Sequence, residues 1–337
     1  MKQKKLYNVA VLGATGAVGQ EMIKVLAERK FPIGELRLLA SGRSAGKAVR
    51  YGGREVVIQE ACDAAFEGMD IVLGAAENDI AKRFAPAIQA AGAVFVDNSS
   101  AFRLDPDVPL VVPEINAEDA YTHKKGIIAN PNCSTIITLM ALAPIARISP
   151  IETIVASTYQ AVSGAGANGL AELEAQAQAY PKGEPLTANA FPHQILFNLL
   201  PRIGGIGENG YSSEEMKLQN EGRKILHLPE LRVTCTCVRV PVMRSHSISA
   251  TFTTKRPVSV EEARAAIAAA EGVQLVDDPN NDVYPMPLDT SDQDDVFVGR
   301  IRRDLVSENG LTLWCCGDQI RKGAATNAVQ IAELLVK

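Results

Sequence analysis

The sequence predicts an α/β fold in which a doubly wound parallel sheet is followed by a second domain of α+β type. The chain has 337 residues, more than one compact core usually holds, so two domains are expected. In the first half, short β-branched runs alternate with helix-like segments, the pattern of a parallel sheet with crossover helices. After Cys133, longer strands alternate polar and apolar residues, as strands of a half-buried sheet do.

The strands expected in the first half are short apolar segments bounded by turn residues. They cover residues 8–13, 35–41, 70–76, 93–100, 110–116 and 126–132. Residues 17–29, AVGQEMIKVLAER, have the apolar spacing of a helix that covers one face of such a sheet.

The second half predicts a buried helix over 134–146 and a long strand over 151–160 that ends in a glycine-rich loop. Residues 231–240 and 245–254 are expected to be strands of antiparallel type. A long loop is expected over 187–209, and residues 321–337 carry the apolar stripe of a helix. Two further helices are expected to start with capping boxes, Ser212 with Glu215 and Ser259 with Glu262.

Composition excludes several classes of protein. With 47% hydrophobic and 22% charged residues, the chain is too apolar for a disordered protein. The formal net charge of −5 argues against nucleic acid or an acidic membrane surface as a partner. The opening segment is too short and too polar at its end for a signal peptide. Residues 126–146 contain no charge, but asparagines and prolines interrupt them, so no membrane-spanning helix is expected.

The six cysteines form no CxxC pair, and the four histidines show no zinc spacing, so no metal site is expected. A disulfide framework is not expected in a chain of this length without a secretion signal. We therefore expect reduced thiols and a cytoplasmic protein.

The segment VLGATGAVG predicts a dinucleotide site. Gly13, Gly16 and Gly19 have the spacing GxxGxxG, directly after a predicted strand and at the start of a predicted helix. Glycines there allow a tight turn and close approach of a pyrophosphate to the helix N-terminus. A structural glycine turn is the alternative.

The end of the second strand indicates which dinucleotide is bound. An acidic residue there would hold a ribose 2′-hydroxyl and repel a 2′-phosphate. The segment LLASGRSAGK has no Asp or Glu, and Arg43 with Ser41 and Ser44 suits a 2′-phosphate. NADP is therefore favoured over NAD.

Cys133, in NPNCSTII, stands where a buried helix is expected to begin near Ser134 or Thr135. The positive end of a helix stabilises a thiolate, and its free amides bind an oxyanion. Free cysteines are commonly just buried, however, so a nucleophile and a core thiol are equally open.

Alternation in VTCTCVRV places Arg239 on one face with Cys235 and Cys237. An arginine on an apolar face requires an anion, which is either a structural carboxylate or a substrate carboxylate. His246 heads the apolar face of the next strand, where it is either a core residue or a general base. From the residues alone it does not rank above His123, His193 or His227.

Three further charged residues are candidates for the site. Glu214 and Lys217 are three apart on the capped helix and therefore share a face, which usually means a solvated ion pair. Arg103, in NSSAFRLD, follows a strand on the cofactor-binding side and faces an oxyanion or solvent.

Taken together, the chain resembles the aspartate-semialdehyde dehydrogenase family. The matching segments occur in the family's order over essentially the whole chain, and their combination is highly specific. They are GATGAVG, SGRSAGK, DNSSAFR, NPNCST, TYQAVSGAGANG, EEMKLQNE, VRVPVMRSHS and WCCGDQIRKGAA.

The resemblance implies reductive dephosphorylation of L-aspartyl-4-phosphate to L-aspartate-4-semialdehyde and phosphate with NADPH, in lysine (diaminopimelate), threonine and methionine biosynthesis. Cys133 would form an acyl-thioester, and His246, with a pKa of about 6–7, would be the acid/base that takes the thiol proton. Gln160 would orient the acyl group. Substrate contacts are implied as follows: Arg239 to the α-carboxylate, Glu214 to the α-ammonium, Arg103 and Lys217 to the phosphate.

The resemblance also implies the cofactor site and the assembly. The residues implied to line the NADP site are Gly13, Thr15, Gly16, Ala17, Val18, Ser41, Arg43, Ser44, Ser163, Gly164 and Gln319. An NADP-binding domain is expected over 1–132, completed by a C-terminal helix in 318–337, and a catalytic and dimerisation domain over 133–317. A homodimer or a dimer of dimers is expected.

Two other functions remain open. N-acetyl-γ-glutamyl-phosphate reductase has a similar cofactor motif and chemistry, but its substrate has an acylated amine and does not need the carboxylate of Glu214. A non-catalytic NADP-binding paralogue would be expected to lose the nucleophile, yet Cys133, Gln160, Arg239 and His246 are all present.

Overall fold

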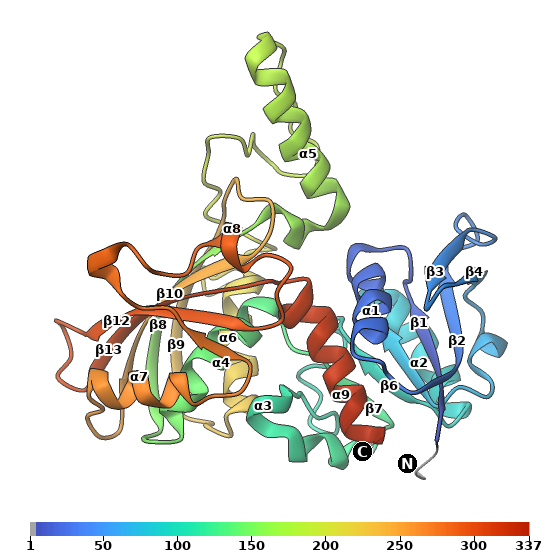
Figure 1. Cartoon of the computed structure of the whole chain (residues 1–337), viewed down its shortest axis with the longest axis horizontal. Coiled ribbons are helices and arrows are strands. Elements are labelled where there is room, and N and C mark those ends of the chain that lie inside the picture. The colour runs from blue at the N-terminus through green and yellow to red at the C-terminus, as the bar shows by residue number, and fades with distance from the viewer. Residues whose placement is uncertain (1–4, 337) are drawn as a thin grey trace. The chain divides into compact units, whose positions relative to one another are not determined.

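The computed structural model describes residues 5–336 (Figure 1). It divides into two compact units: unit 1 is the chain up to Asn132 together with the segment from Ala324, and unit 2 is Cys133–Gly323. The chain thus returns to unit 1 at Ala324, whereas the sequence placed the return at about residue 318. Within the described residues, no helix is both long enough and apolar enough to cross a membrane.

Unit 1 contains a seven-stranded sheet in the order β3-β4-β2-β1-β5-β6-β7. Its strands are β1 (Tyr7–Leu12), β2 (Ile33–Ala40), β3 (Ala48–Tyr51), β4 (Arg54–Glu60), β5 (Ile71–Gly74), β6 (Val94–Asp97) and β7 (Ile127–Ala129). All neighbours are parallel except β3, which pairs antiparallel with β4 at the edge. Because β1 lies between β2 and β5, the strand order reverses beside it, which is where ligands bind to doubly wound sheets.

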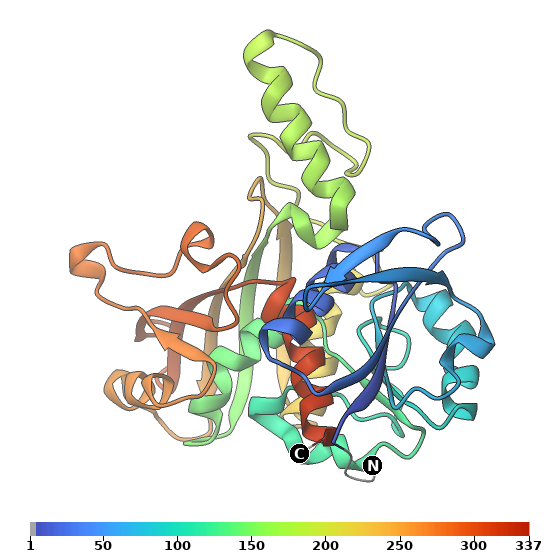
Figure 2. The same ribbon diagram turned by 45° about the vertical axis from the view of Figure 1, so that its right-hand side comes forward.

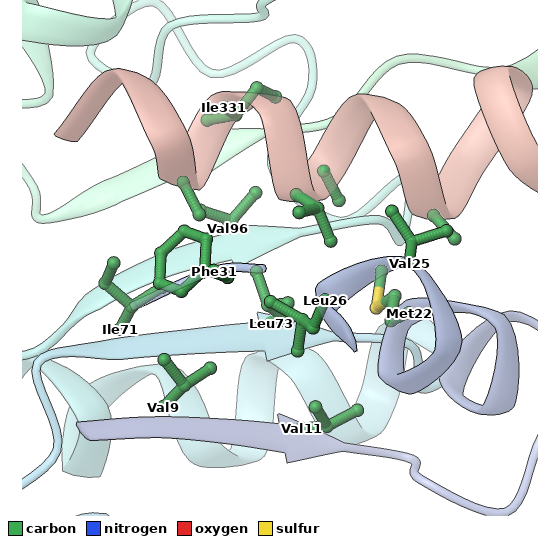
Figure 3. Close-up of a cluster of buried hydrophobic side chains, with 14 of the residues drawn as sticks. Val9, Val11, Met22, Val25, Leu26, Phe31, Ile71, Leu73, Val96 and Ile331 are labelled. Carbon is green, nitrogen blue, oxygen red and sulfur yellow. The ribbon is translucent and has the colours of Figure 1, made fainter. Parts of the chain in front are cut away.

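The helices of unit 1 are α1 (Ala17–Glu28), α2 (Asn78–Ala90), the short α3 (Pro113–Asn116) and α9 (Thr326–Val336). Apolar side chains of β1, β5 and β6 meet α1 and α9 on one face of the sheet (Figure 3). This core is made of fully buried residues such as Val9, Leu73, Val96, Leu26 and Ile331. The stripe predicted for the C-terminal helix is confirmed, because Ala325, Val329, Ile331 and Leu335 all belong to this core.

Unit 2 contains a six-stranded sheet in the order β11-β12-β13-β10-β8-β9. Its strands are β8 (Ile151–Gln160), β9 (Arg232–Arg239), β10 (His246–Thr254), β11 (Val273–Leu275), β12 (Val296–Arg303) and β13 (Gly310–Gly317). One face is covered by helices: α4 (Cys133–Ala146) packs on β10, β12 and β13, α6 (Ser213–Ile225) on β9, and α7 (Val260–Ala268) on β12. The short α8 (Pro287–Thr290) contacts β13.

A separate lobe follows β8. It begins with a 3-10 turn over Val162–Ala165 and continues as α5 (Gly166–Ala179), which projects away from the sheet of unit 2 (Figures 1 and 2). The lobe has a small core of its own. Its members are Val162, Leu173, Phe191, Ile195, Leu196 and Leu200.

Three sequence predictions about elements are wrong. Residues 110–116 are not a strand, because Pro113 starts the short helix α3 and only Leu110 forms a bridge, to Ala129. The strand β9 is parallel to β8 rather than antiparallel, since the chain crosses back through the lobe and α6. The glycine-rich segment after β8 forms a 3-10 turn and the start of α5 instead of a loop, with Gly166 at φ 73° between them.

Candidate active site

The thiol of Cys133 is at the first residue of α4, one position earlier than predicted. The preceding residues Pro131 and Asn132 suit a helix start, because asparagine is favoured just before the first turn. Cys133 is partly exposed, and a Cβ added to Gly323 would come within 2.8 Å of the Cys133 Cβ. The positive end of the helix therefore lies beside this thiol, as stabilisation of a thiolate requires.

Gln160, Arg239 and His246 form a row across three neighbouring strands on the helix-covered face of the unit 2 sheet. The register pairs Gln160 on β8 with Arg239 on β9, and Tyr159 on β8 with Ser247 on β10, so His246 lies on the other side of Gln160. The exposed fractions of Gln160, Arg239 and His246 are 2%, 6% and 0%. Strand alternation puts all three on the inner face.

Glu214 joins this row from α6. Gln160 Nε2 donates to Glu214 Oε1 at 3.2 Å, and Lys217 Nζ is 2.7 Å from Glu214 Oε2. The predicted capping box of Ser212 and Glu215 is confirmed, and it fixes the start of α6 one residue before Glu214. Glu214 is only 9% exposed and the Lys217 side chain is 29% exposed, so the pair is half-buried rather than the solvated pair that its spacing usually indicates.

Burial dominates the electrostatics of the row. Burial lowers the pKa of Arg239, whereas the negative charges of Cys133 and Glu214 raise it. The guanidinium nevertheless stays charged, because an arginine is not deprotonated in proteins. Burial, with the nearby Arg239 charge, lowers the pKa of His246 to about 3, while Glu214 acts in the opposite direction. The expectation of a pKa of about 6–7 for His246 therefore differs from the structure, in which burial lowers this pKa. His246 is a neutral imidazole at cellular pH.

The backbone before His246 is held in an unusual conformation. Ser245 has φ 70°, in the left-handed region that non-glycine residues rarely adopt, and it is fully buried. Its N–H donates to Gln319 Oε1 at 2.9 Å, and its hydroxyl is 2.6 Å from Thr290 Oγ1. The amide of Gln319 in turn hydrogen-bonds the hydroxyl of Ser163. Two residues predicted for the cofactor site, Ser163 and Gln319, thus meet beside His246.

Gly164, also predicted for the cofactor site, leaves space next to two residues of the row. A Cβ added there would come within 2.7 Å of Arg239 Nη1 and 3.3 Å of His246 Nε2. Both nitrogens therefore border the space above the Gly164 Cα, and any side chain would fill it.

In unit 1, the glycine segment joins β1 to α1 as predicted. Gly13 has φ 89°, and a Cβ there would come within 2.6 Å of Ala75 O. A Cβ on Gly19 would collide with Gly13 O, whereas one on Gly16 would meet nothing closer than 3.5 Å. Gly13 and Gly19 are thus required by packing, while the open position of Gly16 at the start of α1 fits close approach of a pyrophosphate.

The loop after β2 carries the residues predicted for a 2′-phosphate. Ser44 N donates to Ser41 O at 2.8 Å, which closes a turn, and Arg43 is exposed. Glu60, at the end of β4, was not predicted as part of this site, and its carboxylate lies 2.8 Å from the position of a Cβ on Gly42. Because β4 pairs with β2, an acidic group stands beside this loop although none lies within it in sequence.

Arg103, predicted to bind an anion, is buried in unit 1 and 6% exposed. Its Nε donates to Asn130 O at 2.9 Å and its Nη2 to Asn98 O at 2.8 Å. Two backbone carbonyls therefore fix the plane of the guanidinium.

Thr158 is a further site residue that was not predicted. Its hydroxyl donates to Gln160 Oε1 at 2.9 Å, which leaves the Gln160 amino group to face Glu214. The signal was present in the sequence, since Thr158 is two residues before Gln160 and shares its face of the strand.

Family models match both parts of the chain. The semialdehyde dehydrogenase NAD-binding domain model matches residues 8–123, and the semialdehyde dehydrogenase dimerisation domain model matches residues 142–322. An aspartate-semialdehyde dehydrogenase from Synechocystis sp. is 53% identical over 329 residues, which cover 98% of this chain and 97% of the relative.

Two solved structures are also similar. Aspartate semialdehyde dehydrogenase II of Vibrio cholerae, complexed with ASA, has a TM-score of 0.96 at 44% identity and covers 99% of both chains. The Candida albicans enzyme with NADP has a TM-score of 0.74 at 27% identity and covers 98% of both chains. With near-complete coverage and identities above 40% to two of these proteins, the chain belongs to the aspartate-semialdehyde dehydrogenase family.

Proposed function

We propose that this chain reduces L-aspartyl-4-phosphate to L-aspartate-4-semialdehyde and phosphate, through a thioester on Cys133. The observation that supports this most is the buried row of Gln160, Arg239 and His246, joined by Glu214, in the same unit as Cys133. A dry site with both a guanidinium and a carboxylate suits a small zwitterionic substrate, because each substrate charge finds its opposite.

Each substrate group has a proposed partner. The guanidinium of Arg239 binds the α-carboxylate, and the carboxylate of Glu214 binds the α-ammonium. Lys217 and Arg103 bind the phosphate, and two cations there offset the charge of the leaving group. Gln160, whose amide is oriented by Thr158 and Glu214, holds the acyl group in line with the thiol of Cys133.

The chemistry follows from the side-chain types. The thiolate of Cys133 attacks the acyl carbon, the C–S bond forms, and phosphate leaves with the electron pair of the C–O bond. A thioester still accepts hydride at its carbon, after which the C–S bond breaks and returns the thiolate. His246, beside Gln160, is proposed to act on the carbonyl oxygen in these steps.

NADP(H) is the proposed cofactor, and when bound it supplies the hydride. The open glycine at position 16, the positive end of α1 and the turn of Ser41 with Ser44 support this assignment, with Arg43 at the 2′-phosphate. The other proposed contacts come from Gly13, Thr15, Ala17, Val18, Ser163, Gly164 and Gln319.

A homodimer, or a pair of dimers, in the cytoplasm is proposed as the working form. The match to a dimerisation domain supports an oligomer through unit 2. The face of the unit 2 sheet that α4 does not cover supports it further, because Val155 is 55% exposed there. Threonine pairs such as Thr251 with Thr312, 2.9 Å apart, lie on the same face.

The test is NADPH formation in the reverse direction. L-Aspartate-4-semialdehyde with inorganic phosphate is compared with N-acetylglutamate semialdehyde, in the wild type and in Cys133→Ala. A phosphate-dependent rate with the first aldehyde, lost in the variant, supports the proposal. A rate with only the acetylated aldehyde would assign the chain to N-acetyl-γ-glutamyl-phosphate reductase. No rate with either would point to a non-catalytic paralogue.

Glu214→Gln provides the matched test of substrate class. If Glu214 binds the ammonium, KM for L-aspartate-4-semialdehyde should rise by about 10- to 10²-fold, because a charge-assisted hydrogen bond of about 1.5–3 kcal/mol is lost. Glu262→Gln is the control, because it removes a carboxylate from the capping box of α7, away from the row.

A further inference from the structure

Both backbone groups of one residue, Ala161, hold side chains of the row. Its N–H donates to His246 Nδ1 at 3.0 Å, and its carbonyl accepts from Arg239 Nη1 at 2.6 Å. Ala161 is fully buried and sits just beyond the end of β8, with φ −60° and ψ 152°. Its methyl group has no chemistry, so sequence motifs give no reason to single it out. The peptide groups on either side of its Cα nevertheless determine where two site residues point.

The direction of the first hydrogen bond decides which nitrogen of His246 carries the proton. A backbone N–H can only donate, so Nδ1 must accept with its lone pair. A neutral imidazole has one protonated and one unprotonated nitrogen, so the proton is on Nε2. We infer that Ala161 is a positioning residue whose N–H fixes His246 in the Nε2-protonated form, so that the ring faces the reacting group as a hydrogen-bond donor.

The same contact opposes a charged ring. An imidazolium carries N–H on both nitrogens, and its Nδ1–H would point at the N–H of Ala161. This opposition adds to the burial and to the Arg239 charge that already lower the pKa of His246. A ring that keeps its contact with Ala161 therefore neither takes a proton at Nδ1 nor has a lone pair at Nε2.

The surroundings of Nε2 agree with a donor. Gln160 Nε2 lies 3.5 Å away, and it is the amino end of the amide, because Glu214 accepts from it and Thr158 donates to the oxygen. Two N–H groups do not hydrogen-bond each other, so both are available to a third group. The Nε2–H of His246 and the Gln160 amino group are thus two neighbouring donors, an arrangement that stabilises a developing negative oxygen. Arg239 Nη1, which borders the space above Gly164, is left for the α-carboxylate.

This inference rests on the proposed function for its catalytic meaning. When the thiolate of Cys133 adds to the acyl carbon, the C–S bond forms and the π electrons of the carbonyl move to oxygen. The Nε2–H of His246 donates to that oxygen, and the electrons return to the carbonyl as phosphate leaves. After hydride addition the same oxygen is again negative, and its electrons return as the C–S bond breaks. No step requires His246 to take the thiol proton.

The first experiment reads the tautomer directly and needs no activity. Protein labelled with 15N in its histidines gives ring-nitrogen signals for four residues, and His246→Asn identifies the signals of His246 by their loss. The expected result is a protonated Nε2 and an unprotonated Nδ1. Both states should stay unchanged from about pH 5 to pH 8, the range in which histidines normally titrate. A ring protonated at Nδ1, or an imidazolium in this range, would overturn the inference.

The second experiment removes the N–H of Ala161. An ester in place of the amide, introduced by incorporating lactic acid at position 161, keeps the methyl and the carbonyl but has no donor. The expected results are loss of the fixed Nε2 form and a fall in kcat of ~10 to 10² -fold, with a smaller change in KM. Ala161→Gly keeps the N–H and should retain the tautomer.

A second ester, at Val162, is the matched control. It removes an N–H that donates to Val242 O at 2.8 Å, so it also costs one buried hydrogen bond of the same segment. It additionally weakens the carbonyl of Ala161 as an acceptor for Arg239, so KM for the semialdehyde should rise while the tautomer stays unchanged. Equal tautomer signals in both esters and the wild type would contradict the role of the Ala161 N–H. If the proposed substrate is wrong, only the steady-state rates would show it, because the 15N signals report the tautomer without any substrate.

Discussion

The ring of Phe191 lies against the guanidinium of Arg239, with Arg239 Cζ 6.0 Å from the ring centroid. Phe191 belongs to the core of the lobe that follows β8, together with Leu173 and Ile195. A Cβ added to Gly169 on α5 would come within 3.1 Å of this ring, so the lobe is tightly packed around it. The packing of the lobe is therefore linked directly to the position of the proposed carboxylate-binding group.

Phe191→Leu should weaken substrate binding more than turnover. The variant keeps apolar volume in the lobe but removes the cation–π contact, worth about 0.5–1 kcal/mol or more when desolvated. KM for the semialdehyde should rise roughly 2- to 10-fold, with kcat nearly unchanged, in steady-state kinetics. Leu173→Val perturbs the same core without touching Arg239 and serves as the control. Equal effects of the two substitutions on KM would show that only the stability of the lobe matters.

Substitutions in the glycine segment should separate packing from cofactor binding. Gly13→Ala places a methyl against Ala75 O at positive φ, so the free energy of unfolding of unit 1 should fall by about 2–4 kcal/mol. Gly16→Ala has room for its methyl and should leave stability nearly unchanged. If a pyrophosphate lies over Gly16, the affinity for NADP should nonetheless fall about tenfold, a loss of 1.4 kcal/mol. Thermal melts with and without NADP measure both effects, and unchanged NADP affinity in Gly16→Ala would remove the cofactor from this position.

The thiols should differ sharply in reactivity with iodoacetamide at neutral pH. Cys133, partly exposed at the start of α4, should react fastest, and exposed Cys62 provides the rate of an ordinary thiol. Buried Cys237 and Cys316 should not react in the folded protein, because hydrogen bonding to Cys235 and burial raise the pKa of Cys237, and burial raises the pKa of Cys316 to about 12.

Peptide mass spectrometry with time measures these rates, and NADP should change the rate of Cys133 but not that of Cys62. Similar slow labelling of both would contradict a thiolate stabilised by the helix N-terminus.

Acid should destabilise the protein partly through His246. Its pKa is about 3 in the folded protein against 6.5 in the unfolded chain, so below pH 6.5 the unfolded chain binds the extra proton. The contribution of this group to the free energy of unfolding is fully present above pH 6.5 and decreases as the pH falls. At 1.36 kcal/mol per pH unit, about 2 kcal/mol is lost at pH 5. Urea unfolding at pH 7.5 and pH 5 should therefore show a smaller loss of stability in His246→Asn than in the wild type. An identical pH dependence of the two proteins would mean that the ring is charged when folded.

Much of the architecture was legible in the sequence because it depends on local patterns. The apolar strands of unit 1, the helix of residues 17–29 and both capping boxes need only neighbouring residues to be recognised. The strand predicted over 110–116 failed because apolar residues before a proline fit both a strand and a helix start. The direction of β9 was not readable, since parallel or antiparallel pairing depends on the path of about 70 intervening residues rather than on alternation.

The candidate site shows the same division. Arg239 and His246 drew attention because a charged or titratable group at an apolar face is conspicuous, but only the register of β8, β9 and β10 places Gln160 between them. Ala161 and Phe191 carry no chemical signature, and their roles depend on backbone direction and on packing. Glu60 was missed for a related reason, because strands distant in sequence become neighbours in a sheet.

The return of the chain at Ala324 has a consequence for the order in which unit 1 can be completed during synthesis. Residues of α9 fill one face of its sheet, and Asn327 Nδ2 donates to Asn130 Oδ1 at 2.7 Å and to Val111 O at 2.9 Å. The ribosome makes all of unit 2 before it makes these residues. Until α9 emerges, nascent unit 1 therefore exposes an apolar face of its sheet, which is the kind of surface that chaperones bind.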